Sequence, residues 1–330
     1  MTAQAIAAGA PRVGFRGSIS RNRRWALFTS YVFLVLFAFF FLVPPYYALV
    51  TATKTSQQIS NQDTNPWLPA LTASEQGLNP GGQNSEKASL STKAISSWLP
   101  AAVQGMFANI DELWNGTDFP IYFRNSAIVT VSVVIITMLI SVPAAFSLGR
   151  MRFWGSGLLA TGVFLTYLVP ESLLFIPLFK VVGALGLLNS YWALILVYPT
   201  LTVPFCTWLM IGYFQSIPKE LDEAALIDGA NYIQMLFKIF IPVALPGLIA
   251  ATIFAFTVSW ADFIYPMAFI FSSDQLVLTA GTVTTLVKAD VYQWGMIMTA
   301  ALIGALPPLV IYAFLMDYYI AGLTAGATKG

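Results

Sequence analysis

Residues 125–148 read NSAIVTVSVVIITMLISVPAAFSL, a stretch without a single charged side chain. A bilayer core about 30 Å thick requires roughly 20 apolar residues at a helical rise of about 1.5 Å each. This stretch therefore predicts a transmembrane helix, and five other stretches meet the same requirement. They are Trp25–Thr51, Gly155–Phe179, Tyr191–Phe214, Pro246–Phe271 and Trp294–Tyr318. We expect an all-α polytopic membrane protein with six transmembrane helices.

The composition of the whole chain agrees with lipid as its main solvent. Hydrophobic residues make up 57% of the 330 residues and charged residues 9%, and the mean hydropathy is +0.72. Soluble domains carry about 25% charged residues. A soluble protein of this composition would expose large apolar patches and aggregate.

Residue counts exclude most catalytic chemistry. The sequence has no His and a single Cys, Cys206, which excludes a Ser-His-Asp or Cys-His site, a His-ligated metal and an internal disulfide. It contains no G-x-x-x-x-G-K-[ST] motif for binding nucleotide phosphates. A net charge of +1 provides no long-range attraction for nucleic acid. We therefore expect a membrane protein that is not an enzyme and holds no metal.

Basic residues near span ends predict the orientation, because Lys and Arg accumulate on the cytoplasmic side. The N-terminal arm carries Arg12, Arg16, Arg21, Arg23 and Arg24. Alternation places Arg150 and Arg152 on the same side as this arm. We expect residues 1–24 to be a cytoplasmic arm, 25–51 the first span, 52–123 a long extracytoplasmic loop and 124–330 a core of five spans. Both termini are then cytoplasmic.

The long outer loop, residues 52–123, changes character along its length. Its first part is polar and contains the turn-forming run Asn79–Gly82. Its later part regains aromatic residues, namely Trp98, Phe107, Trp114, Phe119 and Tyr122. We expect short helices lying on the membrane surface there. A solvated loop and a partner-contacting loop both remain open.

The inner connection, residues 215–245, combines a helix start with a bend. Pro218–Leu221 is typical of a first helical turn, where acidic side chains favour the positive end of the dipole. Asp228-Gly229 breaks this helix, and we expect Asp228 to cap the helix that follows. In that second helix, Ile233, Leu236, Phe237 and Phe240 recur at the spacing of one face. Such a pair of helices fits a groove on another protein, or alternatively rests on lipid headgroups.

The same connection resembles the EAA loop of ABC importer permeases. The resemblance rests on Glu223-Ala224-Ala225-x-x-Asp228-Gly229-Ala230, with Ile239 and Pro242 following. It is strengthened by motifs typical of the carbohydrate branch, namely Ile176–Phe179, Gly186–Ser190, Ile217–Leu221 and Trp260-x-Asp262-Phe263-x-x-Pro266. The chain resembles the second, six-span permease of a maltose-type importer. The outer loop is longer than usual for that family, and Leu236 stands where the family usually has Phe, with Phe237 beside it.

This resemblance implies a type I ABC importer permease fold and several partners. The chain would pair with a homologous permease, and two ATPase subunits would bind ATP and Mg²⁺, while this chain binds no cofactor. An extracytoplasmic solute-binding protein would deliver a sugar or sugar derivative at a bacterial cytoplasmic (inner) membrane. The inner connection would act as a coupling loop held by an ATPase subunit. Its implied coupling residues are Glu223, Ala224, Ala225, Asp228, Gly229, Ala230, Leu236, Phe237 and Pro242.

Polar groups within the spans mark a candidate substrate path, because such groups are costly in lipid and face protein or water. The candidates are Ser259, Trp260, Asp262, Phe263 and Glu171. An aromatic ring beside a carboxylate suits a sugar. Alternatively, Asp262 satisfies backbone groups at a helix break and Trp260 only packs.

Two other classes of protein compete with the importer permease. A self-sufficient secondary carrier or channel predicts internal repeats around a midplane site, and the sequence shows no such repeat. A membrane-embedded enzyme would require paired catalytic groups, which the sequence lacks. The identity of the solute does not follow from the sequence.

Overall fold

The computed structural model describes residues 16–60, 65–69, 101–151, 153–288 and 291–327. Within these ranges the chain is nearly all-helical. The first two thirds of the chain contain α1 (Arg16–Ala52), α2 (Ser56–Ser60), α4 (Ala101–Gly116), α5 (Phe119–Arg150), α6 (Ser156–Tyr167), α7 (Glu171–Ala184) and α8 (Tyr191–Ser216). The last third contains α9 (Glu220–Ile227), α10 (Tyr232–Met235), the π-helix η2 (Leu236–Phe240), α11 (Ile241–Val243), α12 (Leu245–Ala261), α13 (Ile264–Phe269), the 3₁₀ turn η3 (Ser273–Gln275), α14 (Leu278–Leu286) and α15 (Trp294–Ala327).

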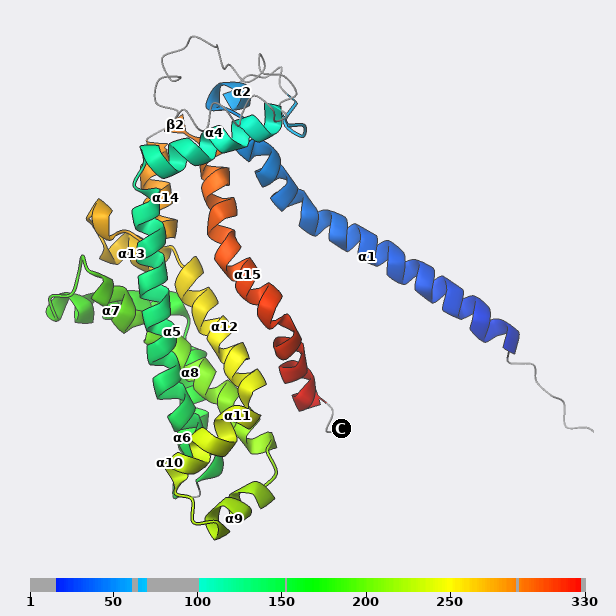
Figure 1. Cartoon of the computed structure of the whole chain (residues 1–330), viewed down its shortest axis with the longest axis vertical. Coiled ribbons are helices and arrows are strands. Elements are labelled where there is room, and N and C mark those ends of the chain that lie inside the picture. Colours follow the sequence, from blue (N-terminus) through cyan, green and yellow to red (C-terminus); the bar gives the residue numbers. More distant parts are fainter. Residues whose placement is uncertain (1–15, 61–64, 70–100, 152, 289–290, 328–330) are drawn as a thin grey trace, which may run out of the picture.

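Helices α5 and α8 pack along most of their lengths and form the centre of the molecule. Helix α12 packs against both of them, and α15 packs on α12 (Figure 1). Thr137 of α5 and Thr202 of α8 share a buried hydrogen bond of 2.7 Å. Hydrogen bonds of this kind help to join helices in lipid, where apolar burial contributes little.

The described helices include four that are long and apolar enough to cross a membrane, within Arg23–Ala52, Phe119–Arg150, Tyr191–Ser216 and Trp294–Met316. Two further spans exist only if each of two bent helix pairs crosses as one unit. The bent pairs are α6 with α7, and the Tyr232–Val243 segment with α12, so the described helices provide four to six spans and six remains a prediction.

The predicted span Gly155–Phe179 is in fact the pair α6 and α7, which meet at an angle of 94°. Pro170 causes the break, since the residue before a proline is disfavoured in the helical conformation and Pro170 itself has ψ of 132°. Glu171 then begins α7, where its charge is favourable to the helix dipole.

The predicted span Pro246–Phe271 is also interrupted. Helix α12 ends at Ala261, and α13 begins at Ile264 after a turn with Asp262 in an extended conformation. At its other end, α12 is bent by 83° from the Tyr232–Val243 segment. One interruption thus lies at Asp262, and the other lies at the end of the inner connection.

Helix α4 crosses the end of the bundle opposite α9, close to the ends of α1, α14 and α15 (Figure 1). The Asn109 amide donates to the carbonyls of Ala52 and Lys54, at 2.8 and 3.1 Å. A helix is thus present in the later part of the outer loop, and it packs on α15 and α1; its position on a membrane surface stays a prediction. Phe119 and Tyr122 are buried, whereas Phe107 and Trp114 are exposed; Trp98 lies outside the described residues.

Two short strands depart from the expected all-α class. Strand β1 (Val287–Lys288) pairs antiparallel with β2 (Val291–Tyr292) between α14 and α15. Val and Tyr have high strand propensity, and the segment lies outside the predicted spans, where backbone groups need not pair within a helix. At the N-terminus, α1 begins at Arg16, so residues 16–24 of the predicted arm are helical.

Candidate functional site

Helix α9 forms the first arm of the inner connection and lies at one extreme end of the molecule (Figure 1). Glu220, Asp222 and Glu223 occupy its first turn, as the sequence predicts. It ends in a Schellman motif: the Ala230 amide donates to Ala225 at 2.9 Å and the Gly229 amide to Leu226 at 3.1 Å. Gly229 has φ of +77°, a conformation that glycine adopts without a steric penalty. The predicted bend is therefore built on Gly229.

The second arm begins at a cap that differs from the one predicted. Asn231 accepts a hydrogen bond from the Gln234 backbone at 2.9 Å, and the Gln234 side chain accepts one from the Asn231 backbone. This is a capping box, in which two orphan amides are satisfied reciprocally. Asp228 instead ends α9 as its C-cap residue. The prediction that Asp228 caps the second helix is wrong, and the Asn-x-x-Gln spacing was the signal for the correct residue.

The apolar residues of the second arm do not share one face. Leu236 and Phe240 are buried, whereas Ile233 is 70% and Phe237 62% exposed. The π-helix η2 accounts for Phe237, because its wider turn rotates Phe237 further from Phe240 than α-helical spacing would; Ile233 precedes η2, in α10. Phe237 thus projects outward beside the buried Leu236.

The predicted coupling residues divide between a buried and an exposed set. Ala225 and Leu236 belong to the apolar core at this end, and Ala230 packs against it. The others are exposed: Glu223, Ala224, Asp228, Gly229, Phe237 and Pro242. Large apolar side chains share this exposure, namely Leu226, Ile227, Tyr232 and Ile233. We call the exposed set Glu223, Leu226, Ile227, Tyr232, Ile233 and Phe237 the coupling surface.

Arg150 at the end of α5 is a residue whose structural role the sequence interpretation missed. Its guanidinium forms a 2.6 Å salt bridge with Asp222 of α9, and its side chain is 5% exposed. It also donates to the carbonyls of Phe214, Ile217 and Pro218, at 3.2, 2.8 and 3.1 Å. The sequence treats Arg150 only as an orientation signal, since nothing in its spacing identifies partners 64 to 72 residues away.

Asp262 occupies the break between α12 and α13. Its carboxylate accepts hydrogen bonds from the backbone amides of Ile264 and Tyr265, at 3.2 and 3.1 Å. It also accepts one from the Tyr198 hydroxyl at 3.0 Å. Asp262 therefore caps a helix break and retains partial exposure.

Glu171 comes close to this break through Tyr265. The Tyr265 hydroxyl donates to the Glu171 backbone carbonyl at 3.2 Å, while the Tyr265 amide donates to Asp262. Glu171 and Phe263 are both exposed. The structure thus brings Glu171 and Asp262, each at a helix break, around one tyrosine.

Ser259 and Trp260 are less available than Asp262 for binding a solute. The Ser259 hydroxyl donates within its own helix to Ala255 at 2.8 Å, and Trp260 donates to the Gly304 carbonyl at 2.9 Å. The Trp260 ring stacks on Phe256, with centroids 5.4 Å apart. Both residues are 6% exposed, so their polar atoms and faces are already in use.

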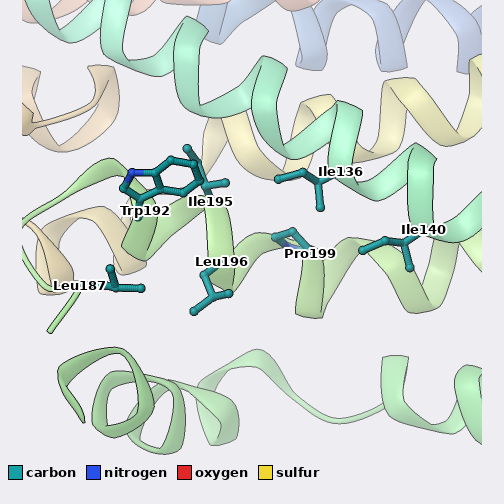
Figure 2. Close-up of a pocket in the computed structure, with 7 residues that line it drawn as sticks. All are labelled: Ile136, Ile140, Leu187, Trp192, Ile195, Leu196 and Pro199. Atoms are coloured by element: carbon teal, nitrogen blue, oxygen red, sulfur yellow. The ribbon is translucent and has the colours of Figure 1, made fainter. Parts of the chain in front are cut away.

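An apolar hollow of about 460 Å³ lies between α5, α8 and the chain near Leu187 (Figure 2). It is lined by Ile136, Ile140, Leu187, Trp192, Ile195, Leu196 and Pro199. A sugar requires several hydrogen-bonding groups, and this lining offers only the indole of Trp192. The hollow is therefore unsuited to a carbohydrate. No cluster of potential metal ligands occurs within the described ranges.

Comparison with known proteins decides the family. Residues 141–324 match the model of the "Binding-protein-dependent transport system inner membrane component" family, which covers α12, both arms of the inner connection and the span helices around them. The chain belongs to this family. Its members are inner membrane components of transport systems that depend on a binding protein, as the coupling-loop resemblance implied.

Similar proteins support this membership over most of the chain. The inner membrane ABC transporter permease protein YcjP of Escherichia coli is 35% identical over 66% of this chain and 79% of its own length. The sulfoquinovosyl glycerol transport system permease protein SmoH of Agrobacterium fabrum is 34% identical, covering 74% and 84%. In fold, the chain is similar to a chain of a bacterial ABC transporter that imports alginate, with a TM-score of 0.67 and 21% identity over 91% and 98%.

Proposed function

We propose that this protein is the transmembrane permease subunit of an ATP-driven, binding-protein-dependent importer for a sugar or sugar derivative. Membership of the inner membrane component family carries the transport function. The carbohydrate class is supported by the relative that transports sulfoquinovosyl glycerol. It agrees with the sugar-branch motifs around Asn189 and Asp262.

The proposed assembly contains this chain, a homologous permease, two ATPase subunits and an extracytoplasmic solute-binding protein. The chain crosses the bacterial cytoplasmic membrane six times, with α6–α7 and α12–α13 as interrupted crossings and both termini in the cytoplasm. It binds no nucleotide itself, and ATP and Mg²⁺ are held by the ATPase subunits. The absence of a phosphate-binding motif in the sequence supports this division of roles.

The coupling surface is the proposed contact with the ATPase. It stands at one end of the molecule and combines the exposed apolar side chains of Ile227, Ile233 and Phe237 with the exposed carboxylate of Glu223. Protein interfaces combine buried apolar and aromatic residues with polar ones in this way. If this surface lies in water, covering its apolar side chains with another protein is favourable in free energy. This supports a protein partner for the coupling surface.

The solute path is proposed to pass the breaks at Asp262 and Glu171, with Phe263 exposed beside them. Interrupted helices line binding sites in many transporters, because unpaired backbone groups are tolerated only against protein or water. Ser259 and Trp260 would support this region through packing. The partner permease would complete the path.

Replacing Asp262 by asparagine tests this path. Asparagine also caps helices, so the α12–α13 break is retained while the charge is lost. We expect the solute concentration for half-maximal uptake to rise about tenfold, the effect of losing roughly 1.4 kcal/mol of a charge-assisted hydrogen bond. Uptake is measured in vesicles, with Asp274→Asn in the exposed turn η3 as control. Unchanged affinity and rate in Asp262→Asn would reduce Asp262 to a helix cap.

Isolation of the complex in mild detergent tests the proposed function itself. We expect an affinity-tagged chain to retain an ATPase and a second permease through size-exclusion chromatography. A chain that transports the solute alone in proteoliposomes, without any ATPase, would instead be a secondary carrier.

A further inference from the structure

Arg150 connects five structural elements that come from three separate parts of the sequence: the end of α5, residues 214–222, and η2. It is the last residue of α5, and its guanidinium contacts carbonyls at the end of α8, the Pro218 turn and Asp222 of α9. The guanidinium carbon also lies 4.9 Å from the ring centroid of Phe240 in η2. Within the described ranges, Arg150–Asp222 is the sole ion pair.

These contacts let the guanidinium stabilise the segments that it joins. The last carbonyls of a helix lack partners within that helix, and a cation there is also favourable to the dipole. Arg150 supplies both a hydrogen-bond partner and a positive charge at the end of α8, where it donates to the carbonyls of Phe214 and Ile217. At 5% exposure, its charge depends on Asp222 and these carbonyls for compensation.

Helix α9 has otherwise little attachment to the bundle. Ala225 is its buried residue, and the remaining side chains face outward or are partly exposed. The first arm of the coupling loop is thus held by one small apolar contact and by the Asp222–Arg150 pair. A force on α9 must reach the membrane helices through these contacts or through the chain itself.

We propose that Arg150 is the positioning residue that transmits movement of the coupling loop to the packed pair α5 and α8. This inference rests on the proposed function, because it requires an ATPase that moves α9. A planar guanidinium with several donors holds the directions of α5, α8 and α9 together, which a lysine ammonium does not do. Two buried atoms of the pair, Arg150 Nε and Asp222 Oδ1, have no partner.

The test uses the assembled transporter in proteoliposomes, with Arg150→Gln and Asp222→Asn. Asp222→Asn leaves the three carbonyl contacts of Arg150 in place. It therefore provides the test if the transporter does not assemble with Arg150→Gln. Arg124→Gln, at the exposed outer end of the same helix, is the matched control. We expect the ATPase to co-isolate with all three variants. We expect the amount of solute imported per ATP hydrolysed to fall about tenfold in Arg150→Gln and Asp222→Asn and to stay unchanged in Arg124→Gln. A tenfold loss corresponds to a coupling free energy within the usual range.

A distance measurement separates transmission from a merely structural role. Spin labels replace Glu220 in α9 and the exposed Leu139 in α5, after Cys206→Ser removes the native thiol. We expect the distance between the labels to be the same with and without an ATP analogue when Arg150 is present, because α9 and α5 move together. In Arg150→Gln, we expect this distance to depend on nucleotide.

Each outcome decides for or against the inference. Wild-type transport per ATP in both variants, or a label distance in Arg150→Gln that matches the wild type in both states, overturns the role of Arg150. The proposed function still stands in that case, since the ATPase co-isolates. Failure of the wild-type chain to retain any ATPase would contradict the proposed function instead.

Discussion

Replacing Gly229 by valine is expected to abolish ATP-driven uptake while the chain still inserts into the membrane and its complex still hydrolyses ATP. Gly229 has φ of +77°, and a Cβ there would meet no atom within 4 Å. The defect therefore comes from backbone conformation alone. A left-handed conformation costs L-residues roughly 1–2 kcal/mol, and a β-branched side chain is a genuine outlier there. The Schellman turn would open, and α9 would lose its direction relative to α10.

Two variants control this prediction in the same proteoliposome assay of uptake and ATP hydrolysis. Gly229→Asn should retain most uptake, since asparagine tolerates the left-handed region. Gly212→Ala, at an exposed helical position with open space, should transport normally. Near-normal uptake by Gly229→Val would show that the bend has no part in coupling.

Placing a charge at the centre of the coupling surface is expected to release the ATPase from the complex. Ile233 and Phe237 are 70% and 62% exposed, so aspartate at either position does not disturb the core of this chain. If the ATPase covers them, each aspartate buries an unpaired carboxylate. Truncating interface anchors costs about 2–4 kcal/mol or more, and an unpaired charge adds to this. We expect the Ile233→Asp, Phe237→Asp double variant to lose the ATPase on size-exclusion chromatography.

The matched control is Trp154→Asp, which changes a residue that is 98% exposed outside the coupling loop. This variant should keep its ATPase. Stable co-isolation of an ATPase with the double variant would contradict the placement of the interface on this surface.

The sequence predicts the central elements of this fold well and its interruptions poorly. The predicted spans Asn125–Leu148 and Tyr191–Phe214 lie within α5 and α8, because long apolar runs have few alternatives in lipid. The predicted span Gly155–Phe179 is bent by 94° near Pro170, and the sequence does not show this bend because the apolar composition continues across it. The same limit applies at Asp262, where a carboxylate caps a helix within an apolar region.

The coupling loop shows the same division between local and long-range information. The bend at Gly229 and the start of α9 follow from local chemistry, and both are present. The exposed position of Phe237 required the π-helix, for which the sequence has no spacing signal. Arg150 required partners from α8, α9 and η2, which only the folded chain brings together.

Cross-linking at Ile227 provides the most direct test that an ATPase holds the coupling loop. Ile227 is 86% exposed beside the Gly229 bend, and the buried Cys206 leaves little background for a thiol reagent. We expect Ile227→Cys, treated in native membranes with a short thiol-to-amine cross-linker, to form an adduct with an ATPase subunit. The Trp154→Cys chain should form none. A complete absence of the Ile227→Cys adduct, with and without ATP, would contradict the assignment of this chain as a coupled importer permease.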